Sequence, residues 1–318
     1  MVLNLLFLAL GMVLLIKGAD WLVDGAAALA KKYKVSDLAI GLTIVAFGTS
    51  APELVVNSFA AAEGHHQMVL GNIIGSNFFN LFLILGVAGI IIPLTVQSST
   101  VWKEIPFSLF AIVLVFAFGN NFFVNQNSLI SRADGFILLG LFFIFLYYVY
   151  SQLKSDPSEI ELEEKNMSNL MITVFIFAGL AGLVIGGKVV LVNAVSIAHV
   201  FGVSERIIGL TVVAAGTSLP ELATSVVAAI KKKSDIAVGN IIGSNIFNFL
   251  LIFAISAIIR PIQYDTIFNR DLYLIAGGTA FLFIAMFTGG KKKLDRWEAA
   301  ILLIVFLAYT YYLINSGN

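Results

Sequence analysis

GLTIVAFGTSAPEL at residues 41–54 occurs again as GLTVVAAGTSLPEL at residues 209–222, with 11 of 14 positions identical. A second pair, GNIIGSNFFN at 71–80 and GNIIGSNIFN at 239–248, matches at 9 of 10 positions. Both pairs have the same spacing between their copies, which we call the repeat offset, since positions 41 and 71 correspond to positions 209 and 239. A repeat period of about half the chain indicates two duplicated halves rather than the short stacked units of a solenoid.

The composition indicates that both halves lie in a membrane. Of the 318 residues, 59% are hydrophobic and 12% are charged, whereas a soluble domain has roughly 25% charged residues. Mean hydropathy is +0.96. Because backbone polar groups in lipid must be paired internally, the recurring apolar runs favour helices. The net charge of zero gives no reason to expect a nucleic-acid partner, and the absence of cysteine excludes disulfides and thiolate metal sites.

We therefore predict an all-α polytopic membrane protein with ten transmembrane helices in two inverted five-helix repeats. Residues 1–154 form the first repeat, 155–168 a linker and 169–318 the second repeat. An odd number of spans in each half inverts the second half relative to the membrane. The ten predicted spans are roughly 2–29, 36–62, 68–92, 104–121, 134–152, 169–198, 204–230, 236–259, 271–289 and 297–315.

The distribution of Lys and Arg predicts the orientation of these spans. With the N-terminus outside, the cytoplasmic loops hold 13 of these residues and the outer loops hold 4. Since positive charge is enriched in cytoplasmic loops, we expect both termini outside and the linker inside. The predicted location is the cell membrane (plasma or inner membrane), with the lipid bilayer as surroundings and no obligate protein partner evident.

Pro52 and Pro220 are expected to break the second and seventh predicted spans. Proline has no amide hydrogen, and its ring clashes with the carbonyl four residues earlier. The carbonyls of Gly48 and Gly216 therefore lose their helical partners. Unpaired carbonyls at membrane depth are tolerated where they line a cavity or meet a cation.

A carboxylate follows each of these prolines, Glu53 in one copy and Glu221 in the other, and no Lys or Arg lies in the same stretch. A charged side chain at the bilayer centre costs about 2.5–3.5 kcal/mol, so two unpaired carboxylates beside free carbonyls indicate a cation site. Further polar residues share helical faces. These faces contain Thr49, Glu53 and Asn57; Thr217, Glu221 and Ser225; Asn72, Ser76 and Asn80; and Asn240, Ser244 and Asn248.

Oxygen-only surroundings suit hard cations such as Ca²⁺ and Na⁺ better than Zn²⁺ or Cu²⁺. Two glutamates neutralise one Ca²⁺ or two Na⁺, and competition between these ions is the basis of antiport, with no resident cofactor. Exchange of Ca²⁺ for H⁺ is the alternative, because the same carboxylates could protonate. We do not expect an enzyme, since an intramembrane hydrolase needs a nucleophile with a base or two aspartates. A passive channel would differ from a carrier by lacking counterflow and saturation.

GTSAPEL with GNIIGSNFFN, and GTSLPEL with GNIIGSNIFN, resemble the α-repeats of the sodium/calcium exchanger family, within the cation/calcium exchanger superfamily, in its prokaryotic form. The resemblance covers essentially the whole chain. It implies a secondary active antiporter that exchanges Ca²⁺ for Na⁺ by alternating access at a central site. It also implies that the first and sixth spans, with Gly11, Gly18, Gly179 and Gly186, form the pair that slides to switch access.

Position by position, the resemblance implies that Glu53 and Glu221 bind Ca²⁺ and share in Na⁺ binding. It implies further oxygen ligands around them. These are backbone carbonyls near Ala46, Thr49, Ala214 and Thr217, the hydroxyls of Ser50, Ser76, Ser218 and Ser244, mainly for Na⁺, and Asn80 and Asn248 to complete the centre.

Comparison with the family's branches bears on the choice of coupling ion. Many relatives have Asp where this chain has Asn248, and that acid is linked to K⁺ co-transport in the potassium-dependent branch. With Asn there, the resemblance does not imply K⁺ dependence. Proton-coupled relatives typically carry a GNxxE-type motif instead of GTSxPE, which argues against H⁺ as the main partner.

Other conspicuous residues have simpler interpretations. The glycines of GNIIGSN are expected to let helices pack closely rather than to bind ions. Lys17, Asp20 and Asp24 are expected to form a local salt bridge near the end of the first span. The lysine run at 231–233 is expected to anchor the topology and to touch anionic lipid.

Overall fold

The computed structural model describes residues 2–122, 128–152, 167–201, 214–289 and 292–316. Nearly all of them are helical, and the four short strands are two residues each. Eight described helices are long and apolar enough to cross a membrane, and a bent pair raises this number to nine. The predicted count of ten is not confirmed. The predicted span 204–230 accounts for the difference, because residues 202–213 lie outside the described part of the chain.

The described elements follow the predicted spans closely. Those of the first half are α1 (Val2–Tyr33), α2 (Asp37–Ile40), η1 (Gly41–Val45), α3 (Ala46–Thr49), α4 (Ala51–Glu63), α5 (His66–Phe78), η2 (Phe79–Ile84), α6 (Leu85–Ile91), β1 (Leu94–Thr95), η3 (Thr100–Glu104), α7 (Ile105–Gly119), β2 (Leu129–Ile130) and α8 (Arg132–Gln152).

The second half repeats this order as far as it is described. Its elements are α9 (Asn169–Val200), α11 (Ala214–Thr217), α12 (Leu219–Ile230), α13 (Ser234–Phe247), η5 (Asn248–Ile252), α14 (Phe253–Ile259), β3 (Ile262–Gln263), η6 (Thr266–Phe268), α15 (Asn269–Ala285), β4 (Lys293–Leu294) and α16 (Arg296–Ser316).

Two helical spans form the centre of the molecule. In the apolar 18-residue stretch of the continuous span α5–η2–α6, 78% of the residues are buried. The corresponding share is 83% in α13–η5–α14 but only 17% in α16. Both central spans contain the GNIIGSN motif in their first half, and its small and polar residues would be poor partners for lipid. The duplicated motifs therefore lie in the interior rather than on the lipid-facing surface.

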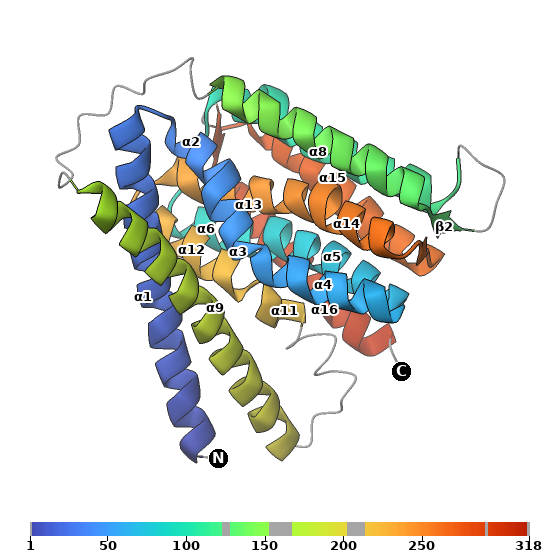
Figure 1. Cartoon of the computed structure of the whole chain (residues 1–318), viewed down its shortest axis with the longest axis horizontal. Coiled ribbons are helices and arrows are strands. Elements are labelled where there is room, and N and C mark those ends of the chain that lie inside the picture. Colours follow the sequence, from blue (N-terminus) through green and yellow to red (C-terminus); the bar gives the residue numbers. More distant parts are fainter. Residues whose placement is uncertain (1, 123–127, 153–166, 202–213, 290–291, 317–318) are drawn as a thin grey trace.

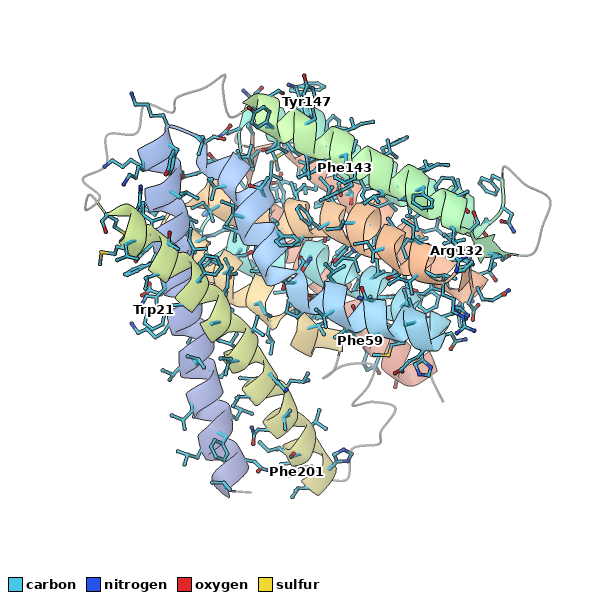
Figure 2. All side chains as sticks on the ribbon, viewed as in Figure 1. Trp21, Phe59, Arg132, Phe143, Tyr147 and Phe201 are labelled. Carbon is cyan, nitrogen blue, oxygen red and sulfur yellow. The ribbon has the colours of Figure 1, made fainter. Side chains whose placement is uncertain are left out.

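The outer helices expose large apolar side chains. Phe143 and Tyr147 on α8 point away from the bundle in Figure 2, as do Phe59 on α4 and Phe201 at the end of α9. Phe59 is 67% exposed and Tyr147 is 73% exposed. A soluble protein rarely exposes so much apolar surface, whereas a helix bundle in lipid requires it.

Helices α1 and α9 lie side by side and extend beyond the rest of the bundle (Figure 1). Their contact is made through glycine on both helices. A Cβ added to Gly18 would lie 2.7 Å from Leu183 N, and one added to Gly179 would lie 2.7 Å from Leu22 N. Because each backbone fills the space where the other would carry a side chain, the two helices pack as a closely fitted pair.

Two arginines cap the ends of the central spans. Arg132 Nε donates to the carbonyl of Ile258 at 3.0 Å, at the end of α14, and Arg296 Nε donates to the carbonyl of Ile90 at 3.1 Å, at the end of α6. A cation there pairs with free carbonyls and with the negative end of the helix dipole. The two acceptors are related by the repeat offset, so the same cap occurs in both halves.

Two pairs of short strands connect loops that the predicted topology places on the same side of the membrane. Strand β1 pairs with β4, with Leu94 opposite Leu294, and both lie in predicted cytoplasmic loops. Strand β2 pairs with β3, with Ile130 opposite Ile262, and both lie in predicted outer loops. The alternation of predicted sides is thus consistent with the contacts of the folded chain.

Candidate functional site

The predicted break in the second span is present. Helix α3 ends at Thr49, Ser50 has φ −86° and ψ 3°, and α4 begins at Ala51 with Pro52 in its first turn. The segments on either side of the break are bent by 48°. Proline suits the first turn because its missing N–H would have no helical partner there.

The same break occurs between α11 and α12. Ser218 has φ −91° and ψ 8°, and Pro220 lies in the first turn of α12. Glu53 and Glu221 therefore both lie in the first turn of a helix that starts inside the protein. Helix N-termini favour negative charge, and each carboxylate lies at such an end.

Both carboxylates are buried, each only 1% exposed. Glu221 lies close enough to Glu53 for their charges to interact. No Lys, Arg or His forms an ion pair with either one among the described residues. The described part of the chain also has no group of three or more His, Cys, Asp and Glu that could hold a metal ion. The candidate site thus has two carboxylates, and the other polar groups described around them are hydroxyls and amides.

Hydrogen bonds between the halves hold the two breaks together. Ser50 Oγ donates to Glu221 Oε1 at 2.9 Å, and the Ser218 side chain interacts with the carboxylate of Glu53. Ser218 Oγ also lies 3.2 Å from Ser76 Oγ on α5. The hydroxyl at each break therefore contacts the carboxylate of the other half.

The asparagines at the start of GNIIGSN make a second set of contacts between the halves. Thr49 Oγ1 donates to Asn240 Oδ1 on α13 at 3.0 Å, and Asn72 Nδ2 on α5 donates to Thr217 Oγ1 at 3.3 Å. Asn72 Oδ1 also accepts from Asn57 Nδ2 at 2.6 Å. The threonine in each GTSxPE motif thus pairs with the asparagine of the opposite repeat.

Several buried oxygens around the two breaks have no hydrogen-bond partner among the described residues. They include Glu53 Oε2, Glu221 Oε2, Asn80 Oδ1 and Asn248 Oδ1. A buried oxygen without a partner costs about 1–3 kcal/mol, and more when it is charged. Because a cation can satisfy carboxylate and amide oxygens together, this group of atoms is suited to bind one.

The predicted site residues are therefore found together on the elements around the two breaks. Thr49, Ser50, Ser76, Asn80, Ser218, Ser244 and Asn248 are all buried. Ala46 begins α3 and is fully buried, and Ala214 begins α11. Thr217 is half-buried at the end of α11.

Two buried asparagines were missed by reasoning from the sequence. Asn245 Oδ1 accepts from Asn80 Nδ2 at 3.1 Å, which leaves Asn80 Oδ1 as the free acceptor. Its counterpart Asn77 is fully buried and donates to the carbonyl of Ile73 at 2.6 Å. Both are the last residue of GSN in the duplicated motif, and this duplication was the signal that could have identified them.

The packing role predicted for the GNIIGSN glycines is seen in the second copy. A Cβ added to Gly243 would lie 2.8 Å from Ala46 Cβ, and one added to Gly239 would lie 2.9 Å from Leu38 O. In the first copy, a Cβ added to Gly75 meets no atom within 4 Å in the described structure. By the repeat offset, the segment that would pack against Gly75 falls in residues 202–213, outside the described part of the chain, so the packing role of Gly75 stays a prediction.

Comparison with known proteins gives matches along the whole chain. Residues 3–151 and 171–315 match the family described as sodium/calcium exchanger protein. The putative antiporter CaxA of Alkalimonas amylolytica is 38% identical over 320 residues, which cover 98% of each chain. The sodium/calcium exchanger MaX1 of Methanosarcina acetivorans is 31% identical over 345 residues, which cover 96% of this chain and 97% of that one.

The fold is also similar to that of solved structures. The sodium-calcium exchanger NCX_Mj, soaked with zero Na⁺ and Ca²⁺, matches with a TM-score of 0.83 and 29% sequence identity. The match covers 100% of this chain and 99% of that chain. The similarity therefore extends over the complete helix bundle.

Proposed function

We propose that this chain, which belongs to the sodium/calcium exchanger family, is a secondary active antiporter that exchanges Ca²⁺ for Na⁺ at one central site. Membership of the family confirms the resemblance seen in the paired motifs. The family consists of exchangers, which are transport proteins and not enzymes. The exchange of Ca²⁺ for Na⁺ in particular is the part that we propose.

The observation that carries this proposal is the pair of buried carboxylates, Glu53 and Glu221, each with an oxygen that has no hydrogen-bond partner in the described part of the chain. Their combined charge of −2 matches one Ca²⁺ or two Na⁺. Ca²⁺ takes 6–8 oxygen ligands in flexible geometry, and the neighbouring hydroxyls, amides and carbonyls are of the required kind. Since one group of oxygens serves both ions, binding of one ion displaces the other.

We assign the ligands as follows. Glu53 and Glu221 bind Ca²⁺ and take part in Na⁺ binding. The remaining ligands are the hydroxyls of Ser50, Ser76, Ser218 and Ser244, the carbonyls near Ala46, Thr49, Ala214 and Thr217, and the side chains of Asn80 and Asn248. Their burial and the contacts between the two halves support this set.

We further propose that residues 1–154 and 169–318 are inverted repeats joined by a cytoplasmic linker, with both termini outside the membrane. The repeated order of elements and the equivalent arginine caps support the duplication. The excess of Lys and Arg in one set of loops supports the orientation. Alternating access then follows if the two halves exchange conformations around the shared site.

A Na⁺ gradient should drive Ca²⁺ movement in proteoliposomes that contain the purified chain. Vesicles loaded with Na⁺ and diluted into Na⁺-free buffer should take up radioactive Ca²⁺ several-fold above protein-free vesicles, with saturation and counterflow. The Na⁺, K⁺ and H⁺ gradients are imposed one at a time. Uptake driven by a pH gradient but not by a Na⁺ gradient would contradict the proposal and identify a Ca²⁺/H⁺ antiporter.

Asn248→Asp should change the ion preference of the site. The substitution adds a third carboxylate where Asn248 Oδ1 has no hydrogen-bond partner within the described structure, and the number of charged ligands tunes Ca²⁺ affinity. A charged ligand contributes about 1.5–3 kcal/mol, so half-saturation should occur at roughly 10–100-fold lower Ca²⁺. K⁺ should stimulate exchange by the variant but not by the parent protein. Unchanged half-saturation and no response to K⁺ would place Asn248 outside the ion site.

A further inference from the structure

Lys231 connects α1 to the turn after α12. Its Nζ lies 2.6 Å from Asp20 Oδ1, donates to the carbonyl of Asp20 at 3.1 Å and forms an ion pair with Asp24. Partial burial would lower the pKa of Lys231, but the interactions with Asp20 and Asp24 outweigh this effect and raise the pKa. The ammonium therefore stays charged between two carboxylates. The salt bridge predicted between Lys17 and Asp20 is long, at 3.9 Å, and Lys231 is the main partner.

The repeat offset relates this ion pair to a second pair with reversed charges. Lys231 corresponds to Glu63 at the end of α4, and Asp20 corresponds to Lys188 on α9. In the pair that is formed, the acidic residue Asp20 lies on α1 and the basic residue Lys231 lies in the turn after α12. In the equivalent pair, the basic residue Lys188 lies on α9 and the acidic residue Glu63 lies at the end of α4. Each pair is therefore complementary in charge.

The two turns have the same backbone. Gly64 has φ 83° and the corresponding Lys232 has φ 60°, so both are left-handed. The N–H of Gly64 donates to Ala61 O, and that of Lys232 donates to Ala229 O, so the donors and the acceptors are both related by the repeat offset. Glu63 and Lys231 thus occupy equivalent positions in equivalent turns.

The second pair is not formed in this structure. Glu63 interacts with His65 at 3.2 Å, and both side chains are largely exposed. Lys188 is exposed on a membrane-spanning helix, and no ion pair of its side chain is found among the described residues. An ammonium within a span is costly and normally has an acidic partner, which makes Glu63 the natural candidate.

The packing of α1 and α9 shows the same difference between the two halves as the ion pairs do. Helix α1 packs along α12, whereas α9 makes no comparably extensive contact with the equivalent helix α4 within the described structure. Because α1 and α9 are fitted together through Gly18 and Gly179, movement of one should carry the other. A conformation that exchanges the roles of the halves would separate α1 from α12 and bring α9 to α4.

We propose that Lys231 with Asp20 and Asp24, and Lys188 with Glu63, are two ionic latches that close alternately on opposite sides of the membrane. The first latch is closed in this structure, and the second closes in the opposite access state. The inference rests on the proposed alternating access. Both pairs are partly exposed, so each should bias the two states by a moderate factor and neither should lock the transporter.

The absence of cysteine makes a cross-linking test direct. One variant carries Asp20→Cys with Lys231→Cys, and the other carries Lys188→Cys with Glu63→Cys. Both are reconstituted and treated with a short bifunctional thiol reagent in Na⁺, in Ca²⁺ and without either ion. We expect both pairs to cross-link, with yields that change in opposite directions between these conditions.

A charge substitution then tests the latch itself. Lys231→Gln should raise the cross-link yield of the Lys188→Cys and Glu63→Cys pair several-fold, because it releases the competing latch. Lys232→Gln, the neighbouring residue in the same turn, is the matched control and should leave the yield unchanged. Failure of the second pair to cross-link in any condition, parallel yields of the two pairs, or no effect of Lys231→Gln would overturn the proposal.

The cross-linking result does not depend on which ions are transported. Opposed cross-link yields without Na⁺-driven Ca²⁺ flux would overturn the proposed ions and leave the latches standing. Normal Na⁺-driven flux without opposed yields would overturn the latches alone.

Discussion

Replacement of Glu53 or Glu221 by Gln is expected to reduce Na⁺-driven Ca²⁺ uptake to the level of protein-free vesicles. Each substitution removes half of the site's charge and turns one buried carboxylate oxygen into an amide nitrogen that cannot bind a cation. The loss of a charged ligand costs about 1.5–3 kcal/mol, or roughly 10–100-fold in affinity. Radioactive Ca²⁺ uptake and direct titration of Ca²⁺ binding would both measure this loss.

The two glutamates should behave alike, because each contacts the serine at the opposite break. Glu161→Gln in the acidic linker removes one carboxylate elsewhere in the chain and should retain full uptake. Full uptake by both Glu53→Gln and Glu221→Gln would show that ions bind elsewhere. A loss in only one variant would contradict a site shared equally by the two halves.

Gly18→Ala is expected to destabilise the protein and to slow transport, although alanine normally favours helices. The added Cβ would lie 2.7 Å from Leu183 N and 2.8 Å from Gly179 O, which are backbone atoms that cannot turn away. Overpacking of this kind costs about 1–3 kcal/mol. Helices α1 and α9 would have to separate, so both the melting temperature in detergent and the rate of exchange should fall.

Gly140→Ala in α8 and Gly277→Ala in α15 are matched controls, because an added Cβ meets nothing within 4 Å at either position in the described structure. Both controls should keep the melting temperature and the transport rate of the parent, or raise the former slightly through helix propensity. A Gly18→Ala variant as stable and active as these controls would show that close α1–α9 packing is unimportant for the protein.

Predictions that depend on local sequence were confirmed. Pro52 and Pro220 predicted the helix breaks, because proline limits the backbone of its own residue and of the preceding turn. Apolar runs predicted most helices to within a few residues, and the duplicated motifs predicted the family. The division into inverted repeats, the orientation and the ion-binding roles stay predictions.

Helical periodicity gave faces of polar residues but not their partners. It placed Thr49 on one polar stripe and Asn240 on another, and only the folded chain shows that they form a hydrogen bond between the halves. It overlooked Asn245, which leaves the oxygen of Asn80 free by accepting from its amide nitrogen. The orientation of an amide depends on the neighbours it meets, which the spacing within one helix does not determine.

The sequence by itself determined a duplicated, lipid-embedded helix bundle with one proline break and one carboxylate in each half. The tertiary structure decided how these parts meet, including the contact of Ser50 with Glu221 and of Lys231 with Asp20. These partners are separated by 171 and 211 residues. Local rules fix the backbone within a few turns, whereas contacts across such separations depend on how whole helices pack, because packing selects which buried polar groups can satisfy one another.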